Sequence, residues 1–342
     1  MTEGAGQQPT VSICCPVYNH AQYLPRMLDS LLAQQGERFE ILLNDDASTD
    51  GSTEILRDYE SRYPGVVRVV YHDENQYSKM PIIAPRFLFP IARGEFVAFC
   101  EGDDFWLSPD KLSRQVAAMR RHPEVGLSFH PVQRVRGESD NAGVSGQLSS
   151  DECRVPFERV VLGGGGFCPT PSVMLRAEYL PAISRCVEIA PVSDKFFQII
   201  ATSAGGALFI PDVLSAYRVG NAGAWTQRFA GSEMLQQYES LVEPPYRWLL
   251  NNLPESQHDI LRFSLADQFM VLAMKYFSAG VSDRAANCYD KAMRELSSRR
   301  FPLSIMPGGD TSPAILKLVS RGWPLLRTAY RKQAMRNSLP EG

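Results

Sequence analysis

Two pairs of neighbouring acidic residues each follow directly on an apolar stretch of the sequence. Asp45 and Asp46 follow one such stretch, and Asp103 and Asp104 follow another, with Glu101 just before them. Crowded carboxylates repel one another unless a cation or hydrogen-bond donors balance their charge. Carboxylate oxygens are the ligands that hard divalent cations prefer, so the sequence predicts a Mg²⁺ or Mn²⁺ site that is shared with substrate phosphates.

Helix capping offers a second explanation for part of this pattern. Ser48 and Asp50 stand just before a helical pattern and suit a capping role as well as a ligand role, so both readings stay open. Capping does not explain Asp103 and Asp104, because two aromatic residues follow them rather than the start of a helix. Neither GxGxxG nor GxxxxGK[ST] occurs, which argues against dinucleotide-dependent dehydrogenases and P-loop nucleotidases.

The elements that must position these carboxylates alternate between strand and helix patterns. Continuous apolar, partly β-branched runs predict strands buried on both faces, and helical stripes separate them. This alternation predicts an α/β fold with a doubly wound, mostly parallel sheet and right-handed crossovers. Ligands bind outside the carboxyl ends of the strands in such sheets. The predicted strands of this first part are 11–17, 39–44, 66–71, 95–101 and 125–130.

The later part of the chain has a different pattern. Residues 134–166 are rich in glycine, serine and charge, which predicts a long mobile loop. Strand and helix patterns then return, and from about residue 232 onward only helical patterns remain. We therefore predict an α/β domain over residues 1–231 and a helical C-terminal extension over residues 232–342.

Composition limits the classes of function. The 342 residues are 44% hydrophobic, which supports a sizeable core and excludes a disordered or collagen-like chain. A formal net charge of −3 gives no overall field for nucleic acid, so no nucleic-acid partner is expected. Seven cysteines without a CxxC pair favour reduced thiols, and the N-terminal residues do not form a signal peptide, so we expect a cytoplasmic protein.

Three motifs occur in the order and strand context described above: CCPVYN, NDDASTDGS and FCEGDDFW, with PDKLSRQ just after. Together they resemble the N-terminal half of the family 2 glycosyltransferases of the GT-A fold. The resemblance covers residues 11–130 and continues more weakly to about residue 226. It implies a nucleotide-sugar donor, with UDP- or dTDP-sugars favoured, a divalent metal and inversion at the anomeric carbon. The acceptor hydroxyl would belong to a glycan, a lipid-linked molecule or a small molecule.

The resemblance assigns the half 11–130 to the nucleotide-sugar. Tyr18 matches the position whose ring packs on the base, and Asp46 matches the carboxylate that accepts from the base imide nitrogen. Asp103 and Asp104 match the pair that touches the ribose and the metal bound to the pyrophosphate. Glu101 stands where many members have Asp, and its longer side chain leaves its contact with metal or ribose open. The remaining residues assigned to the nucleotide-sugar are Pro16, Asn19, Asp45 and Ser48.

The half 131–231 would bind the acceptor and supply the catalytic base. Asp194 matches the family's base, an aspartate that opens a helix; the alternative is that it only stabilises the helix N-terminus through the dipole. The residues assigned to the acceptor are Thr170, Ser172, Arg218 and Trp225. A plain turn into a strand explains the segment around Thr170 equally well. The histidine that many members carry after the Tyr-Arg pair is absent here.

Two alternative functions remain, and the binding partner of one C-terminal segment is left open. A nucleotidyltransferase would also use a metal on an α/β sheet, but its glycine-rich basic loop is missing; a non-catalytic binding scaffold would predict loss of a carboxylate or of the base. The tract from Ala314 to Arg336 is basic and amphipathic. It predicts either peripheral contact with the anionic inner face of a membrane or packing on the catalytic domain or on a homodimer partner.

Overall fold

The structure is a computed structural model that describes residues 8–80, 82–137, 140–220, 232–297, 322–324 and 327–328. The chain divides into two compact units. Most described residues up to 220 form the first, here called the α/β unit. The short segments 161–163 and 189–191 and the described residues from 232 onward form the second, here called the helical unit. The predicted boundary after residue 231 lies outside the described residues and remains a prediction.

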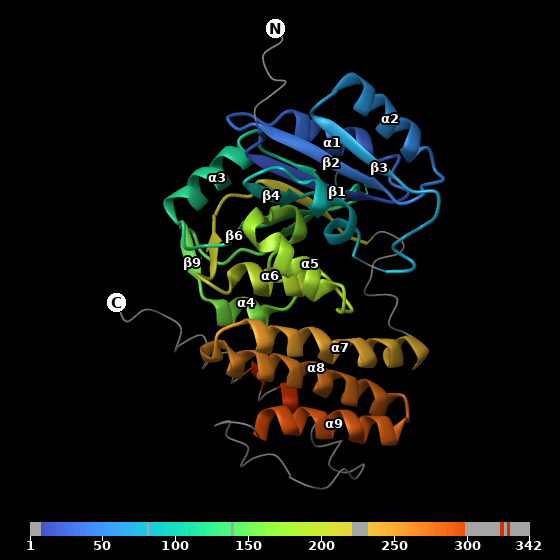
Figure 1. Cartoon of the computed structure of the whole chain (residues 1–342), viewed down its shortest axis with the longest axis vertical. Helices are drawn as coiled ribbons and strands as arrows, with labels where there is room; N and C mark the ends of the chain where they lie inside the picture. Colours follow the sequence, from blue (N-terminus) through green and yellow to red (C-terminus); the bar gives the residue numbers. More distant parts are fainter. Residues whose placement is uncertain are drawn as a thin grey trace. The chain divides into compact units, whose positions relative to one another are not determined.

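In the described part of the α/β unit, an eight-stranded sheet forms the centre (Figure 1). Its strands, in spatial order, are β3 (Val67–Tyr71), β2 (Phe39–Asp45), β1 (Val11–Val17), β4 (Phe96–Phe99), β10 (Met174–Arg176), β6 (Leu127–Phe129), β11 (Ala207–Phe209) and β9 (Cys153–Val155). The first four are parallel to one another, as predicted. Strand β10 runs antiparallel between β4 and β6, so the sheet is mixed beyond β4.

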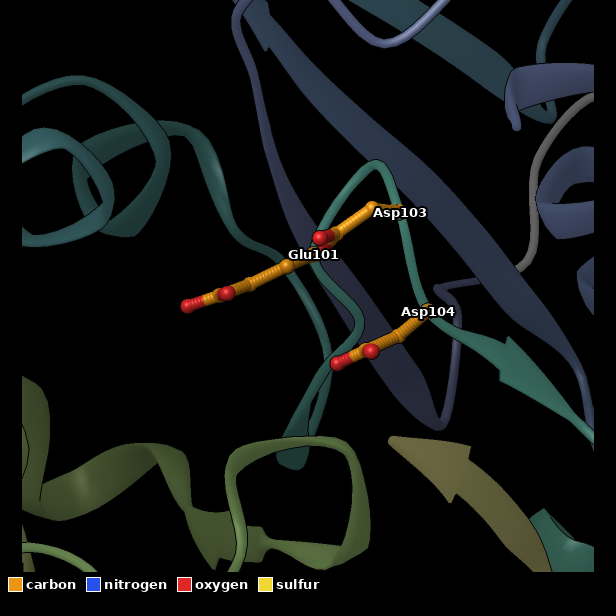
Figure 2. Close-up of side chains that lie close together, drawn as sticks. All are labelled: Glu101, Asp103 and Asp104. Atoms are coloured by element: carbon orange, nitrogen blue, oxygen red, sulfur yellow. The ribbon is translucent and has the colours of Figure 1, made fainter. Parts of the chain in front are cut away.

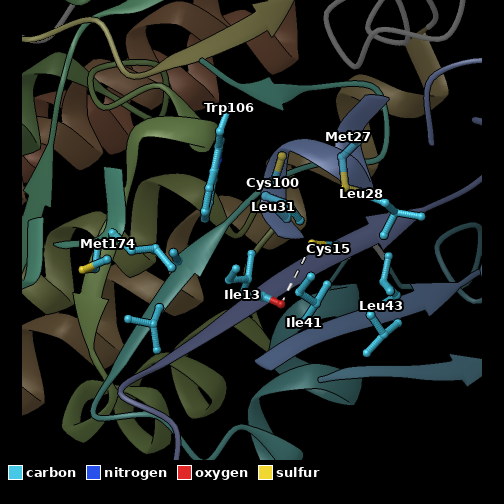
Figure 3. Packing of buried hydrophobic residues seen from close by; sticks show 14 of the residues in the cluster. Ile13, Cys15, Met27, Leu28, Leu31, Ile41, Leu43, Cys100, Trp106 and Met174 are labelled. Carbon is cyan, nitrogen blue, oxygen red and sulfur yellow. Dashed lines mark hydrogen bonds between the residues drawn. The ribbon is translucent and has the colours of Figure 1, made fainter. Parts of the chain in front are cut away.

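Helices cover both faces of this sheet, which confirms the doubly wound arrangement. On one face, Ile13 and Cys15 of β1 pack with Leu28 and other apolar residues of three helices (Figure 3). On the other face, the ring of Phe99 stacks on that of Phe197, with centroids 5.2 Å apart and planes 9° apart. The helices are α1 (Leu24–Leu32), α2 (Ser52–Arg62) and α3 (Lys111–Arg121) on the first face and α6 (Asp194–Thr202) on the second.

The apolar spacing of α1 explains why this segment is a helix and how it packs. Leu24, Met27, Leu28 and Leu31 lie on one stripe and are all fully buried. A proline in the first turn is compatible with the helix because the backbone N–H there has no intrahelical partner. The stripe holds α1 against the sheet and so fixes where the β1–α1 loop lies.

The prediction of a long mobile loop over residues 134–166 is wrong. The segment contains most of β7 (Val132–Arg136), then β8 (Asp140–Ser145), β9 and α4 (Phe157–Gly163). Strands β7 and β8 pair as an antiparallel hairpin and belong to a second sheet with the order β5-β12-β7-β8, where β5 is Phe105–Trp106 and β12 is Ser215–Arg218. Strand β8 is largely solvent-exposed, so its polar composition hid the strand pattern.

Among the described residues of the helical unit, three long helices lie side by side: α7 (Ser232–Asn252), α8 (His258–Ser278) and α9 (Ser282–Ser297) (Figure 1). None of the described helices combines the length and apolarity that crossing a bilayer requires. Trp323, which belongs to the basic tract 314–336, is buried in this unit. Its Nε1 donates to Asp267 Oδ1 at 3.0 Å, and its ring stacks on that of Phe263. Most of the remaining tract lies outside the described residues.

A buried carboxylate connects the amino ends of the central strands through hydrogen bonds. Glu40 of β2, almost fully buried, accepts hydrogen bonds from Ser12 Oγ (2.7 Å) and from the backbone N, Nε and Nη2 of Arg93 (2.9, 2.9 and 2.6 Å). Burial raises the pKa of Glu40, but the bonds from Arg93 and Ser12 outweigh burial, and the pKa lies below the ordinary glutamate value. This cluster joins β2 and β1 to the turn that enters β4.

We expect Glu40→Gln to lower the free energy of unfolding by about 1–3 kcal/mol at neutral pH, because hydrogen bonds to a charged group are lost. A lowered native pKa means that the carboxylate stabilises the fold above the ordinary glutamate value and loses that effect as the pH falls through the native value. Urea denaturation at pH 7 and at pH 4 measures both effects. The matched control is Glu95→Gln, whose exposed ion pair with Arg120 contributes little. Equal stability of the two variants at pH 7 would contradict this prediction.

Candidate active site

The register of the parallel strands brings the loops after β1, β2 and β4 to one edge of the sheet. Val17, the last residue of β1, lies opposite Asp45, the last residue of β2. The backbone N–H of Asp46 donates to Val17 O at 3.0 Å, and that of Gly102 donates to Pro16 O at 3.1 Å. The three loops that carry the predicted nucleotide-sugar residues are therefore held together by backbone hydrogen bonds.

The loop between β4 and β5 presents three carboxylates, here called the acidic loop (Glu101, Asp103 and Asp104). One oxygen from each side chain lies within 4.8 Å of the other two. Figure 2 shows the three side chains leaving this loop and extending toward the same side. The backbone N–H of Asp104 donates to Glu101 O at 3.0 Å, so the loop is a tight turn that keeps the carboxylates together.

Electrostatic repulsion within the acidic loop is strong. Loss of hydration, then the charges of Asp103 and Asp194, raise the pKa of Glu101 to about 8. Burial, then Asp103 and Glu101, raise the pKa of Asp104 well above its usual range, although the backbone N–H of Arg218 opposes this by donating to Asp104 Oδ1 at 2.7 Å. Arg218 therefore offsets the repulsion within the loop only in part.

A divalent cation fits this loop. Asp104 is 1% exposed, and its Oδ2 is buried without a hydrogen-bond partner in the part of the chain that the structure describes. An unpaired buried carboxylate oxygen is costly. Three carboxylates of this spacing supply oxygen ligands of the kind that Mg²⁺ and Mn²⁺ take. The structure brings Asp103 and Asp104, which were predicted to hold the metal, into one turn with Glu101, whose contact was left open; the metal role of these residues remains a prediction.

Asp194 lies within electrostatic range of the acidic loop although it comes from a distant part of the chain. It is the first residue of α6, as predicted, and Ser193 Oγ donates to its Oδ1 at 3.2 Å. Loss of hydration raises the pKa of Asp194, and the Ser193 bond opposes this shift. Burial first, and then the charges of Glu101, Asp104, Asp103 and Asp194, raise the pKa of the Tyr217 hydroxyl, so this hydroxyl lies within electrostatic range of all four carboxylates.

The glycine run 163–166 approaches Asp194 at Gly165. A Cβ at Gly165 would meet the Cβ of Asp194 at 3.7 Å, which is ordinary contact. Gln198, one turn into the helix, holds this run: its Nε2 donates to Gly165 O at 2.7 Å, and its Oε1 accepts from the backbone N–H of Cys168. Sequence reasoning missed Gln198, because a polar residue within an apolar helix gives no sign of the segment to which it bonds.

The loops after β1 and β2 are bonded to each other. The backbone N–H of Asn19 donates to Ser48 Oγ at 3.0 Å, and Asn19 Oδ1 accepts from the N–H of Thr49 at 2.8 Å. Asp45 accepts from the N–H of Ser48 and from Thr53 Oγ1. Asn19 and Ala47 both have positive φ angles, of 56° and 60°. These contacts position the two loops, and the geometry leaves the predicted donor contacts of Asn19, Asp45 and Ser48 as predictions.

Tyr18 and Asp46 flank this pair of loops. The Tyr18 side chain is 46% exposed, so its ring is open to a partner. Asp46 is buried, and its two oxygens accept from the backbone N–H groups of Gln76 (2.6 Å) and Tyr77 (2.9 Å). No sequence pattern indicated that these two backbone N–H groups bond to Asp46. Each carboxylate oxygen has a second lone pair, so Asp46 can still accept a further hydrogen bond.

The residues predicted to bind the acceptor lie in different elements of the chain. Thr170 and Ser172 form a short 3-10 turn before β10, and Ser172 is buried with its hydroxyl donating to Pro169 O at 2.6 Å. Arg218 ends β12 beside the acidic loop and is 5% exposed. Trp225 lies outside the described residues.

Comparison with known proteins was made at the level of sequence and of fold. Residues 12–178 match the family described as Glycosyl transferase family 2. An uncharacterized protein of Mycobacterium tuberculosis (strain ATCC 25618 / H37Rv) is 31% identical over 220 residues, which are 63% of this chain and 60% of that relative. The chain thus spans about three-fifths of the length of that relative.

Two solved structures share the fold. The crystal structure of S. aureus TarS 1-349 in complex with UDP-GlcNAc superposes with a TM-score of 0.65 and 17% identity, covering 92% of each chain. The mannosyltransferase PcManGT from Pyrobaculum calidifontis, in complex with GDP-Man and Mn²⁺, gives a TM-score of 0.51 and 19% identity over 96% of this chain and 85% of its own. At these identities the likeness establishes the fold.

Proposed function

We propose that this chain, whose residues 12–178 match the family described as Glycosyl transferase family 2, transfers a sugar from a nucleotide-sugar to an acceptor hydroxyl, with inversion and with help from a divalent metal. One observation carries the proposal. The acidic loop and Asp194 come from distant parts of the sequence, yet Phe99, at the end of the strand before the loop, stacks on Phe197, one turn into the helix that Asp194 opens. This arrangement supports the proposal, because it brings carboxylates that would hold a cation near a carboxylate that would take a proton.

The donor would lie along the loops after β1, β2 and β4. The exposed ring of Tyr18 would stack on the nucleobase, and Asp46 would accept from the base imide N–H. UDP- and dTDP-sugars are favoured because both carry that imide donor. Pro16, Asn19, Asp45 and Ser48 would shape the ribose and base subsite through the backbone and side-chain bonds described above.

Asp104 and Asp103 would hold the Mg²⁺ or Mn²⁺ ion, with Glu101 beside them. When bound, such an ion neutralises pyrophosphate charge as it develops on the leaving group. These three residues would position the donor phosphates. The hydrogen bond from the backbone N–H of Asp104 to Glu101 O keeps their carboxylates in one turn. We also propose that Thr170, at the turn before β10, faces the acceptor, while the buried Ser172 holds that turn through Pro169.

The transfer would be a single displacement. An acceptor oxygen forms a bond to the anomeric carbon while the bond from that carbon to the phosphate oxygen breaks, and the electron pair leaves with the nucleoside diphosphate. Asp194 takes the hydroxyl proton as the new bond forms. A carboxylate suits this role because almost no acceptor hydroxyl is ionised at neutral pH, and general base catalysis contributes about 10²–10⁴ in rate.

A panel of UDP-, dTDP- and GDP-sugars, incubated with the full chain and Mn²⁺ or Mg²⁺, tests the function. We expect release of nucleoside diphosphate from a UDP- or dTDP-sugar and, by NMR, inversion of the released sugar's anomeric configuration. Release of pyrophosphate would indicate nucleotidyl transfer instead. Failure to bind or to turn over any member of the panel would contradict an enzymatic role in sugar transfer.

A further inference from the structure

The side of the acidic loop that faces the protein is supported by residues from two distant segments. Arg218 Nε donates to Asp103 O at 2.8 Å, and the Arg218 backbone N–H donates to Asp104 Oδ1 at 2.7 Å. One arginine at the end of β12 therefore bonds to two consecutive residues of the loop, once through its side chain and once through its backbone.

An aromatic residue holds the guanidinium in place. Arg218 Cζ lies 4.1 Å from the centroid of the Tyr23 ring, within the range of a cation–π contact. Tyr23 directly precedes α1, and its N–H donates to His20 O at 2.8 Å. The buried stripe of α1 fixes this helix against the sheet, so the Tyr23 ring is a fixed surface for the arginine plane.

The acidic loop also packs closely against His20 at Gly102. Gly102 is buried, and a Cβ built on it would collide with Nδ1 of His20. Only a glycine allows the loop to lie this close to the β1–α1 segment. The acidic loop is thus in contact with His20 on one side and with Arg218 on the other.

We propose that Arg218, held by Tyr23, is a positioning residue that sets the geometry of the cation-binding carboxylates, rather than a residue that contacts the acceptor. Arg218 is 5% exposed, which fits this role, because a residue that binds the acceptor would need a solvent-accessible side chain. The inference rests on the proposed function only in requiring that the acidic loop binds a divalent cation. Residues that orient metal ligands typically affect metal affinity by about 10- to 100-fold.

Direct Mn²⁺ binding to the full chain tests this role, measured by the EPR signal of free Mn²⁺ with and without UDP and in the absence of acceptor. Arg218→Lys keeps the charge but loses the Nε donor and the flat guanidinium, and we expect it to weaken Mn²⁺ binding about 10- to 100-fold. Tyr23→Leu, which removes the ring and leaves Arg218 in place, should weaken binding in the same direction. Tyr23→Phe keeps the ring and should retain the affinity.

Arg176 provides the matched control. Its Nε also donates to a backbone carbonyl, that of Val125 at 2.9 Å, and its guanidinium lies over the Phe96 ring, at the opposite end of β4. We expect Arg176→Lys to lower the melting temperature while Mn²⁺ affinity stays unchanged. Unchanged Mn²⁺ affinity in both Arg218→Lys and Tyr23→Leu, with a raised KM for the acceptor in the first, would overturn this inference alone. Absence of Mn²⁺ binding by the unaltered chain would overturn the cation site and the metal-dependent function as well.

Discussion

Asp194→Asn is expected to lower kcat by about 10²–10⁴ while nucleotide-sugar and metal still bind normally. Asparagine keeps the shape of the side chain and an oxygen that can accept the Ser193 hydrogen bond, but it cannot take the acceptor proton. The loss should therefore appear in turnover at saturating donor and acceptor. Steady-state kinetics with the donor identified by the panel, together with donor affinity by calorimetry, separates the two quantities.

Asp283→Asn is the matched control for Asp194→Asn. Asp283 also lies in the first turn of a helix, α9, and is exposed in the helical unit. Removing its charge changes the helix-terminus electrostatics without affecting the proposed site, so kcat should not change. A variant of Asp194 that lost donor binding but kept its rate at saturation would show that Asp194 belongs to the donor site, and the base would have to be another group.

Removal of divalent metal should abolish transfer, and Asp104→Asn should reproduce most of that loss. The Asn side chain keeps an Oδ1 that can accept the Arg218 backbone N–H, so the loop should fold as before. It replaces the buried, unpaired Oδ2 with an amide nitrogen, which cannot bind a cation. We expect kcat/KM to fall by about 10²-fold or more, since charge stabilisation on the leaving group is worth several kcal/mol.

The measurement is activity in chelator, then with added Mn²⁺ or Mg²⁺, for the unaltered chain and for two variants. Asp110→Asn is the control: this exposed carboxylate at the start of α3 pairs with Arg114 and lies outside the acidic loop. It should respond to metal as the unaltered chain does. Full transferase activity in chelator, or in Asp104→Asn, would refute the metal assignment.

The strands that carry the site could be predicted because each is buried on both faces. In such strands nearly every residue is apolar, as in VSICCPV and FEILLN, and the polar residues that follow mark the carboxyl edge. This reasoning found the acidic loop and the loops after β1 and β2. The role of Asp194 came from resemblance, because an aspartate that opens a helix is by itself equally suited to stabilising the helix N-terminus.

Other features of the structure could not be predicted from local sequence patterns. The hairpin β7–β8 was missed because β8 is largely exposed and polar, and because the glycines at 137 and 143 have the positive φ angles, 52° and 88°, that turns and irregular strands use. The antiparallel direction of β10 depends on pairing partners far along the chain. For the same reason the bonds from Arg218 to the acidic loop, and from Gln76 and Tyr77 to Asp46, could not be predicted.

The stacked pair Phe99–Phe197 has a consequence for how acceptor preference could change. Phe99 ends the strand that leads into the acidic loop, and Phe197 lies one turn into the helix that Asp194 opens. A non-polar contact thus lies between the helix that begins with Asp194 and the strand that leads into the acidic loop. A smaller or larger side chain at position 197 would move α6 without altering any charged group. Under the proposed function, libraries that seek to accommodate bulkier acceptors should therefore vary this aromatic pair before the polar residues, because its volume sets the spacing between Asp194 and the acidic loop.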